Sequence, residues 1–183
     1  LGVLKPVRLG ARVISVGNIQ AGGSGKTPLV AQIAREAIER GQRVCVLMRG
    51  YRGAWENEGG VVHASQSGSG RPRVELCGDE AALLHQEAPG IWIAVGADRA
   101  RQYVRAIEKS EIPFDLVILD DGFQNMNIEK DVEILAMTSA RWWERLYRDF
   151  PWSARRAALR VWTKGVREPL GYAGSTRKNG NSS

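Results

Sequence analysis

The residues best suited to chemistry lie in a glycine-rich stretch that ends in lysine and threonine. It reads Gln20-Ala21-Gly22-Gly23-Ser24-Gly25-Lys26-Thr27. Glycines let backbone N–H groups close around phosphate oxygens, because no Cβ stands in the way, and a following helix adds the positive end of its dipole. The stretch predicts a phosphate-binding loop in which Lys26 reaches the β- and γ-phosphates and Thr27 binds Mg²⁺. Gln20 stands where the usual pattern has glycine.

The segments on either side of this stretch have the patterns that such a loop needs. The apolar run around residues 13–16 is typical of a buried strand. In residues 29–38 the apolar side chains recur at spacings of three and four, as on one face of a helix. Strand, glycine-rich turn and helix thus follow in the required order. The alternative is a glycine-rich turn that binds nothing.

Two adjacent aspartates, Asp120 and Asp121, follow the apolar run 116–119. A carboxylate that emerges at the end of a buried strand beside a phosphate loop can hold Mg²⁺ directly or through water. Adjacent carboxylates point in different directions, so one can serve the metal while the other orients a water, a lysine or the acceptor. The sequence leaves open which does which. A polar strand end without a metal is the alternative.

The remaining elements predict an α/β fold in three layers, of the P-loop NTPase type, with a mostly parallel sheet. Apolar strands are expected at 44–48, 91–95, 116–119, 132–137 and 159–162, with helices between most of them. Val61, Val62 and Val74 indicate a small hairpin away from the main sheet. We expect one nucleotide-binding domain over residues 1–165, incomplete at both ends, and a disordered or aberrant tail over 166–183.

Composition narrows the class of protein. The chain has 183 residues, 43% hydrophobic content and a net charge of +6. It has no apolar run near the ~20 residues of a membrane-spanning helix, and residues 1–12 lack the apolar centre of a signal peptide. Cys45 and Cys77 have no metal-ligand or redox spacing, which favours a reducing cytoplasm. The Arg-rich stretch 141–167 is interleaved with tryptophans. It could form a solvated surface, or it could contact nucleic acid or an anionic membrane surface.

The nucleotide is predicted to be ATP. Guanine-specific proteins commonly carry [NT]-K-x-D near the last strand, and Thr163-Lys164-Gly165 begins in that way. Val166 then stands where the carboxylate that pairs with guanine would be. Partition-type ATPases carry a signature lysine where this chain has Ala21, which disfavours that class.

With these residues in place, the chain resembles the tetraacyldisaccharide 4′-kinases, which phosphorylate a lipid A precursor at the cytoplasmic face of the inner membrane. The resemblance extends over residues 12–137 and rests on motifs in the same order and at similar spacing. They are Ser15-Val16-Gly17-Asn18, Gly22-Gly23-Ser24-Gly25-Lys26-Thr27-Pro28, Arg49-Gly50-Tyr51, Gly78-Asp79-Glu80 and Asp120-Asp121-Gly122-Phe123-Gln124.

The resemblance implies roles for residues. Asp79 matches the family's proposed general base, which takes the proton from the sugar 4′-hydroxyl; read alone, it is equally a helix N-cap. Lys26 and Asp121 would take part in catalysis. Arg49, Tyr51 and Gln124 would bind the acceptor. For Arg49 and Tyr51 the alternative is an ordered loop in which the arginine is solvated.

The resemblance also implies ATP and Mg²⁺ as cofactors, a glycolipid substrate, a peripheral membrane location, a monomer and no nucleic-acid partner.

The chain departs from the family pattern in three ways. Asn125 stands where the family usually has histidine, and Ala81 where it has proline. Family members also continue into a smaller C-terminal domain, so we expect this chain to be a fragment. Two other functions stay open: a regulatory, partition-type ATPase that works as a nucleotide-switched dimer, and a nucleotide-binding module without catalysis.

Overall fold

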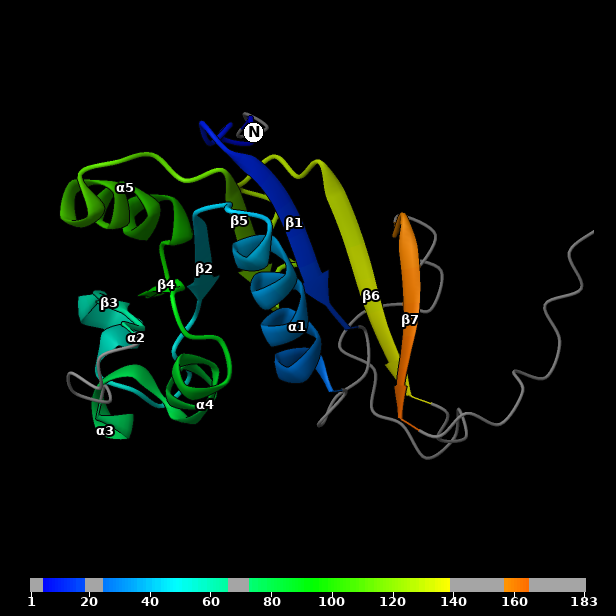
Figure 1. Ribbon diagram of the computed structural model, residues 1–183, viewed down its shortest axis with the longest axis horizontal. Helices are drawn as coiled ribbons and strands as arrows, with labels where there is room; N and C mark the ends of the chain where they lie inside the picture. Colours follow the sequence, from blue (N-terminus) through cyan, green and yellow to red (C-terminus); the bar gives the residue numbers. More distant parts are fainter. Residues whose placement is uncertain (1–4, 19–24, 66–72, 139–156, 165–183) are drawn as a thin grey trace, which may run out of the picture.

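The computed structural model describes residues 5–18, 25–65, 73–138 and 157–164 of the chain. Within these ranges seven strands form one sheet in the order β3-β4-β2-β5-β1-β6-β7 (Figure 1). Their bounds are β1 (Arg12–Gly17), β2 (Val44–Met48), β3 (Gly60–His63), β4 (Trp92–Val95), β5 (Leu116–Asp120), β6 (Val132–Thr138) and β7 (Leu159–Lys164). The predicted tail, 166–183, lies outside the described residues.

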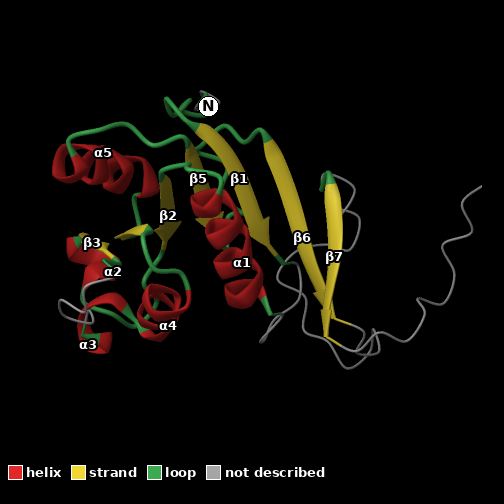
Figure 2. Ribbon diagram, viewed as in Figure 1, coloured by secondary structure: helices red, strands yellow, loops and turns green. Residues whose placement is uncertain are grey.

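Helices cover both faces of the sheet (Figure 2). They are α1 (Lys26–Glu39), α2 (Trp55–Glu58), α3 (Val74–Cys77), α4 (Asp79–Glu87) and α5 (Arg99–Ser110). Alternate residues of β2 face opposite layers: Val46 packs in the cluster that holds α1 and α4, and Leu47 in the cluster that holds α5. Parallel strands covered on both sides read as continuous apolar runs, which explains why the sequence predicted them. The three-layer α/β prediction is confirmed. Of the helices that the structure describes, none is long and apolar enough to cross a membrane.

The structure corrects one detail, the small hairpin predicted from Val61, Val62 and Val74. Strand β3 pairs antiparallel with β4 and forms an edge of the main sheet, with Val61 opposite Ala94. Val74 begins helix α3. The physical reason is burial: Val61 packs against the core on the α5 side and Val62 against the core on the α1 side. At the sheet edge both side chains find apolar neighbours that a separate hairpin would lack.

The carboxyl ends of β1, β2 and β5 meet at one edge of the sheet. All three strands are parallel, and the register places Val16 beside Asp120. The segments that leave this edge are the glycine-rich loop after β1, the Arg49 loop after β2 and the loop that begins at Asp121. Ligands of open α/β sheets bind at such an edge, so the fold brings the predicted motifs together.

Candidate functional site

The described end of the predicted phosphate loop is a turn that only glycine accommodates well. Gly25 has a φ of 69°, the left-handed region, and a Cβ built there would lie 2.9 Å from Thr163 Cβ of β7. Lys26 and Thr27 follow as the first two residues of α1. In the described part of the chain no side chain caps this helix, and its first turn holds no acid, so its N–H groups and dipole are disposed to receive an anion. The predicted residues Gln20, Ala21, Gly22, Gly23 and Ser24 lie outside the described ranges.

Lys26 joins the start of α1 to the ends of two strands. Its Nζ donates to Asp121 Oδ1 at 2.7 Å and to Asn18 Oδ1 at 3.1 Å. The lysine side chain is only 11% exposed, and that of Asp121 is 35% exposed. The pair is therefore partly shielded from water, where a charge-assisted hydrogen bond is stronger than at the surface.

The adjacent carboxylates Asp120 and Asp121 occupy different environments. Asp120 ends β5 and is 4% exposed, and its Oδ1 has no hydrogen-bond partner among the described residues. Burial raises the pKa of Asp120 to about 7, against the opposing effect of Lys26. Asp121 leaves the strand with a φ of 53°, a conformation rare outside glycine, asparagine and aspartate and often found at functional sites. The backbone thus turns the second carboxylate toward the lysine.

The loop after β5 is fastened to the end of β1. The Gly122 N–H donates to Val16 O at 3.2 Å, and Gln124 Nε2 donates to Asn18 O at 3.1 Å. Phe123 is fully buried, and its backbone and Cβ come so close to Gly17 that no side chain fits there. The contact with Phe123 explains why glycine stands at position 17, and the hydrogen bonds hold the loop that carries Asp121 in place.

A cavity of about 460 Å³ opens at this edge of the sheet. It is formed by the start of α1, the loop after β2, the start of α4 and the end of β5. The predicted residues that line it are Lys26, Arg49, Tyr51, Asp79, Asp120 and Asp121. The structure therefore brings the candidate phosphate, metal and acceptor residues to one hollow of a size suited to a small ligand.

Asp79 is the first residue of α4, and it is exposed to the cavity. The N-cap of this helix is Gly78, with a φ of 85°, and no side chain caps it within the described residues. The alternative interpretation of Asp79 as the N-cap was therefore wrong, because the turn places the glycine at that position. The carboxylate lies in the first turn of α4, on the wall of the cavity.

The predicted acceptor residues lie on the outer part of the site. Arg49 Nε donates to Glu56 Oε1 at 2.7 Å. Tyr51 is 66% exposed, and the Arg52 guanidinium lies over its ring. Gln124 lines an adjoining hollow of about 460 Å³, which Arg49 and Asp121 also border. The structure thus places Gln124 next to the main cavity and not inside it.

Two residues of this region were missed by the sequence reasoning. Asn18 was quoted only as part of a motif, and Arg99 was not considered. Arg99 begins α5 and borders the adjoining hollow. Burial lowers its pKa, nearby Arg49 lowers it further, and Asp121 acts in the opposite direction. The signal that could have found it is its position shortly after β4, at the same sheet edge.

The described residues provide few side chains that could bind a metal ion. Among the described residues no group of three or more His, Cys, Asp and Glu side chains could hold a metal ion. Asp120 Oδ1, which has no partner in the described part of the chain, and the Thr27 hydroxyl are hard oxygen donors. Mg²⁺ commonly takes only one or two protein carboxylates and keeps waters and substrate phosphates as its other ligands, so this donor set fits Mg²⁺.

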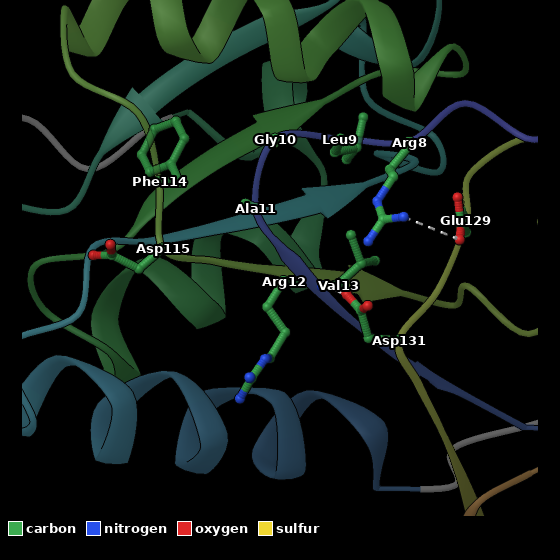
Figure 3. Close-up of a pocket in the computed structure, with 10 residues that line it drawn as sticks. All are labelled: Arg8, Leu9, Gly10, Ala11, Arg12, Val13, Phe114, Asp115, Glu129 and Asp131. Atoms are coloured by element: carbon green, nitrogen blue, oxygen red, sulfur yellow. Dashed lines mark hydrogen bonds and ion pairs between the residues drawn. The ribbon is translucent and has the colours of Figure 1, made fainter.

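A second hollow, of about 500 Å³, lies at the opposite edge of the sheet, where β1 and β5 begin (Figure 3). Arg8 and Glu129 face each other across it at 4.0 Å. The Asp131 carboxylate accepts from the Val13 N–H at 2.7 Å, and the Asp115 carboxylate accepts from the Arg43 N–H at 2.8 Å. These aspartates hold backbone N–H groups in place. We therefore assign them a structural role and do not regard this hollow as a catalytic site.

Comparisons with known proteins agree with the geometry. A family model described as tetraacyldisaccharide-1-P 4′-kinase matches residues 1–147. The tetraacyldisaccharide 4′-kinase of Pelobacter propionicus is 41% identical over 138 residues, and that of Geobacter metallireducens is 37% identical over 174 residues. The crystal structure of "apo" form LpxK from Aquifex aeolicus in complex with ATP superposes with a TM-score of 0.73 at 33% identity.

The matches cover most of this chain but no more than half of each of the other proteins. The Pelobacter alignment covers 75% of this chain and 37% of the relative, and the Geobacter alignment 89% and 49%. The Aquifex structure is matched over 87% of this chain and 50% of that chain. The chain thus spans at most about half the length of these relatives.

Proposed function

Since the chain belongs to the tetraacyldisaccharide-1-P 4′-kinase family, we propose that it is the nucleotide-binding part of a kinase of lipid A biosynthesis. The kinase transfers the γ-phosphate of ATP to the 4′-hydroxyl of a tetraacyldisaccharide 1-phosphate. The observation that carries this proposal is the contact of Lys26 with Asp121 in a cavity that Asp79 also lines. The partition-type ATPase that the sequence left open is set aside, because the family model matches a kinase.

The phosphate loop binds the nucleotide in this proposal. The backbone N–H groups of residues 20–25 and the first turn of α1 receive the phosphate oxygens. Lys26 Nζ bonds to the β- and γ-phosphates, where negative charge builds up as the bridging bond breaks. The ATP complex of the Aquifex structure supports ATP as the nucleotide. The partly buried position of Lys26 supports its role, because a charge acts more strongly where water is excluded.

Mg²⁺ fits the same site, held by Thr27 and by Asp120, with Asp121 beside them. When bound, the ion neutralises charge on the phosphates. One oxygen of Asp120 is buried and has no hydrogen-bond partner among the residues that the structure describes, which is costly unless a partner is supplied. The Lys26 contact of Asp121 orients that carboxylate toward the lysine. We therefore assign Asp120 as the principal protein carboxylate of the metal site and Asp121 as the partner of Lys26.

Asp79 serves as the general base. Its carboxylate accepts the proton of the sugar 4′-hydroxyl while that oxygen forms a bond to the γ-phosphorus and the bond from the γ-phosphorus to the bridging oxygen of ADP breaks. Arg49 and Tyr51 line the same cavity and Gln124 the adjoining hollow, so these residues bind the acceptor. Positioning and charge neutralisation supply most of the acceleration of phosphoryl transfer, and a base typically adds about 10²- to 10⁴-fold.

The organisation and location follow from the same proposal. We assign residues 1–165 to the nucleotide-binding domain and leave residues 166–183 outside that assignment. The protein acts as a monomer with peripheral contact at the cytoplasmic face of the inner membrane, and it has no nucleic-acid partner. The glycolipid acceptor supports a membrane contact, because a tetraacylated substrate resides in a bilayer.

Transfer of labelled γ-phosphate from ATP to a tetraacyldisaccharide 1-phosphate tests the function. We expect labelled lipid with the wild-type chain and none above background with Lys26→Ala. Lys5→Ala, an exposed lysine outside the site, serves as the matched control and should retain activity. ATP binding without labelled lipid would favour a nucleotide-binding module without catalysis. This outcome is worth testing because the chain matches only about half the length of its relative.

A further inference from the structure

Asn18 contacts two parts of the site at once. It is fully buried directly after β1, and its side-chain Oδ1 accepts from Lys26 Nζ at 3.1 Å. Its backbone oxygen accepts from Gln124 Nε2 at 3.1 Å. Asn18 is therefore fixed to the loop that carries Asp121, and it presents a neutral oxygen to the lysine.

The chemistry of the two acceptors of Lys26 differs. An ammonium group has three donors, and Asp121 and Asn18 each take a hydrogen bond from it. The carboxylate of Asp121 compensates the lysine charge and competes with phosphate for it. The amide oxygen of Asn18 accepts a hydrogen bond without compensating the charge, so it can stay in place while Lys26 binds an anion.

The long side chain of lysine makes such a partner useful. Four rotatable bonds separate Nζ from the backbone, and their freedom is lost when the ammonium is held at one point. A buried acceptor that is already present restricts this freedom before the ligand arrives, which improves binding through preorganisation.

We propose that Asn18 is a positioning residue that holds Lys26 Nζ at the phosphate site when the lysine exchanges its contact with Asp121 for a nucleotide phosphate. The proposal rests on the proposed function, because Lys26 must bind the β- and γ-phosphates. It predicts that Asn18 acts through Lys26 and only on ligands that extend beyond the α-phosphate.

A double-mutant cycle on this chain tests the proposal, with calorimetric titration of ATP and AMP. Asn18→Ala should weaken ATP binding about 10-fold, the usual effect of losing a hydrogen bond to a charged group, and leave AMP binding unchanged. In the Lys26→Ala background it should cost nothing further, because the partner of Asn18 is gone. Ser15→Ala, at a fully buried polar residue within β1, is the control and should bind like the wild type.

A structural role gives a different pattern. The role of Asn18 would be overturned if Asn18→Ala lowered the affinities for ATP and AMP equally, or if it lowered ATP affinity as much in the Lys26→Ala background as in the wild type. Binding of ATP by the wild-type chain would still support the proposed function in that case. Absence of ATP binding by the wild-type chain would contradict both. Asn18→Leu, which fills the site but has no acceptor, should match Asn18→Ala. Unfolding of both variants, read by circular dichroism, would assign Asn18 to the core and overturn the proposal.

Discussion

Lys26 Nζ lies 2.7 Å from Asp121 Oδ1, although 95 positions separate the two residues in the chain. The contact links the first residue of α1 to the first residue after β5, across the edge where β1 and β5 end. The same ammonium is the group proposed to bind the phosphates. A nucleotide must therefore share Lys26 with Asp121 or displace it, and this competition makes the contact measurable.

Asp121→Asn should tighten the binding of metal-free ATP several-fold and lower turnover. The substitution keeps the shape of the side chain but removes the charge that competes for Lys26 and repels phosphate. Calorimetry in the presence of a chelator measures the affinity. Glu129→Gln, in an exposed ion pair at the opposite edge, is the control and should have no effect. Unchanged ATP affinity of Asp121→Asn would show that the contact does not restrain the lysine.

Asp79→Ala should leave nucleotide affinity largely intact and reduce turnover at least ~100-fold, because a general base acts on the acceptor and not on ATP. Label transfer to the lipid acceptor measures turnover, and calorimetry measures affinity. Glu75→Ala, an exposed acid in the neighbouring helix α3, should leave both values near those of the wild type. Near-normal turnover of Asp79→Ala would remove Asp79 from the mechanism.

Asp120→Asn should stabilise the metal-free chain above pH 7 more than at pH 5. Burial raises the pKa of Asp120 to about 7, so the folded state binds the proton more tightly than the unfolded state does. The stability from this group is thus present at low pH and is lost as the pH rises toward 7. Thermal melts in chelator at several pH values measure how much Asp120→Asn stabilises the fold. We expect this stabilisation to be greater at pH 8 than at pH 5 by on the order of 2 kcal/mol. Equal gains at pH 5 and pH 8 would contradict the shift.

Gly25→Ala should weaken ATP binding and destabilise the fold by about 1–2 kcal/mol, because an L-residue is strained at the left-handed φ of this position and its Cβ would meet Thr163. Gly10→Ala is the matched control, since nothing lies within 4 Å of a Cβ built there. Denaturant melts of both variants measure the difference. Equal stabilities would show that the turn relaxes around the new side chain.

The sequence allowed the core strands and the position of the site to be predicted, because both depend on local pattern. Apolar runs marked β2 and β5, and strand ends followed by glycine or aspartate marked the carboxyl edge of the sheet. The antiparallel pairing of β3 could not be predicted, because four residues with two valines fit a hairpin and a sheet edge equally well.

Roles that depend on tertiary contacts were also beyond the sequence. Asn18 and Arg99 belong to the site only because β1 and β4 end at the same edge as β5. No spacing along the chain reveals that Asn18 meets Lys26, or that Arg99 lies close to Arg49. The assignment of Asp121 to the lysine likewise required its backbone conformation, since both aspartates follow the same strand.

Calorimetric titration of Mg·ATP into the wild-type chain, Lys26→Ala and Lys5→Ala tests the central claim most directly. We expect saturable binding by the wild type and by Lys5→Ala, and a loss of affinity of at least about 10-fold in Lys26→Ala. Equal affinity of all three proteins, or no binding by any of them, would contradict the claim that Lys26 and the phosphate loop form a nucleotide site.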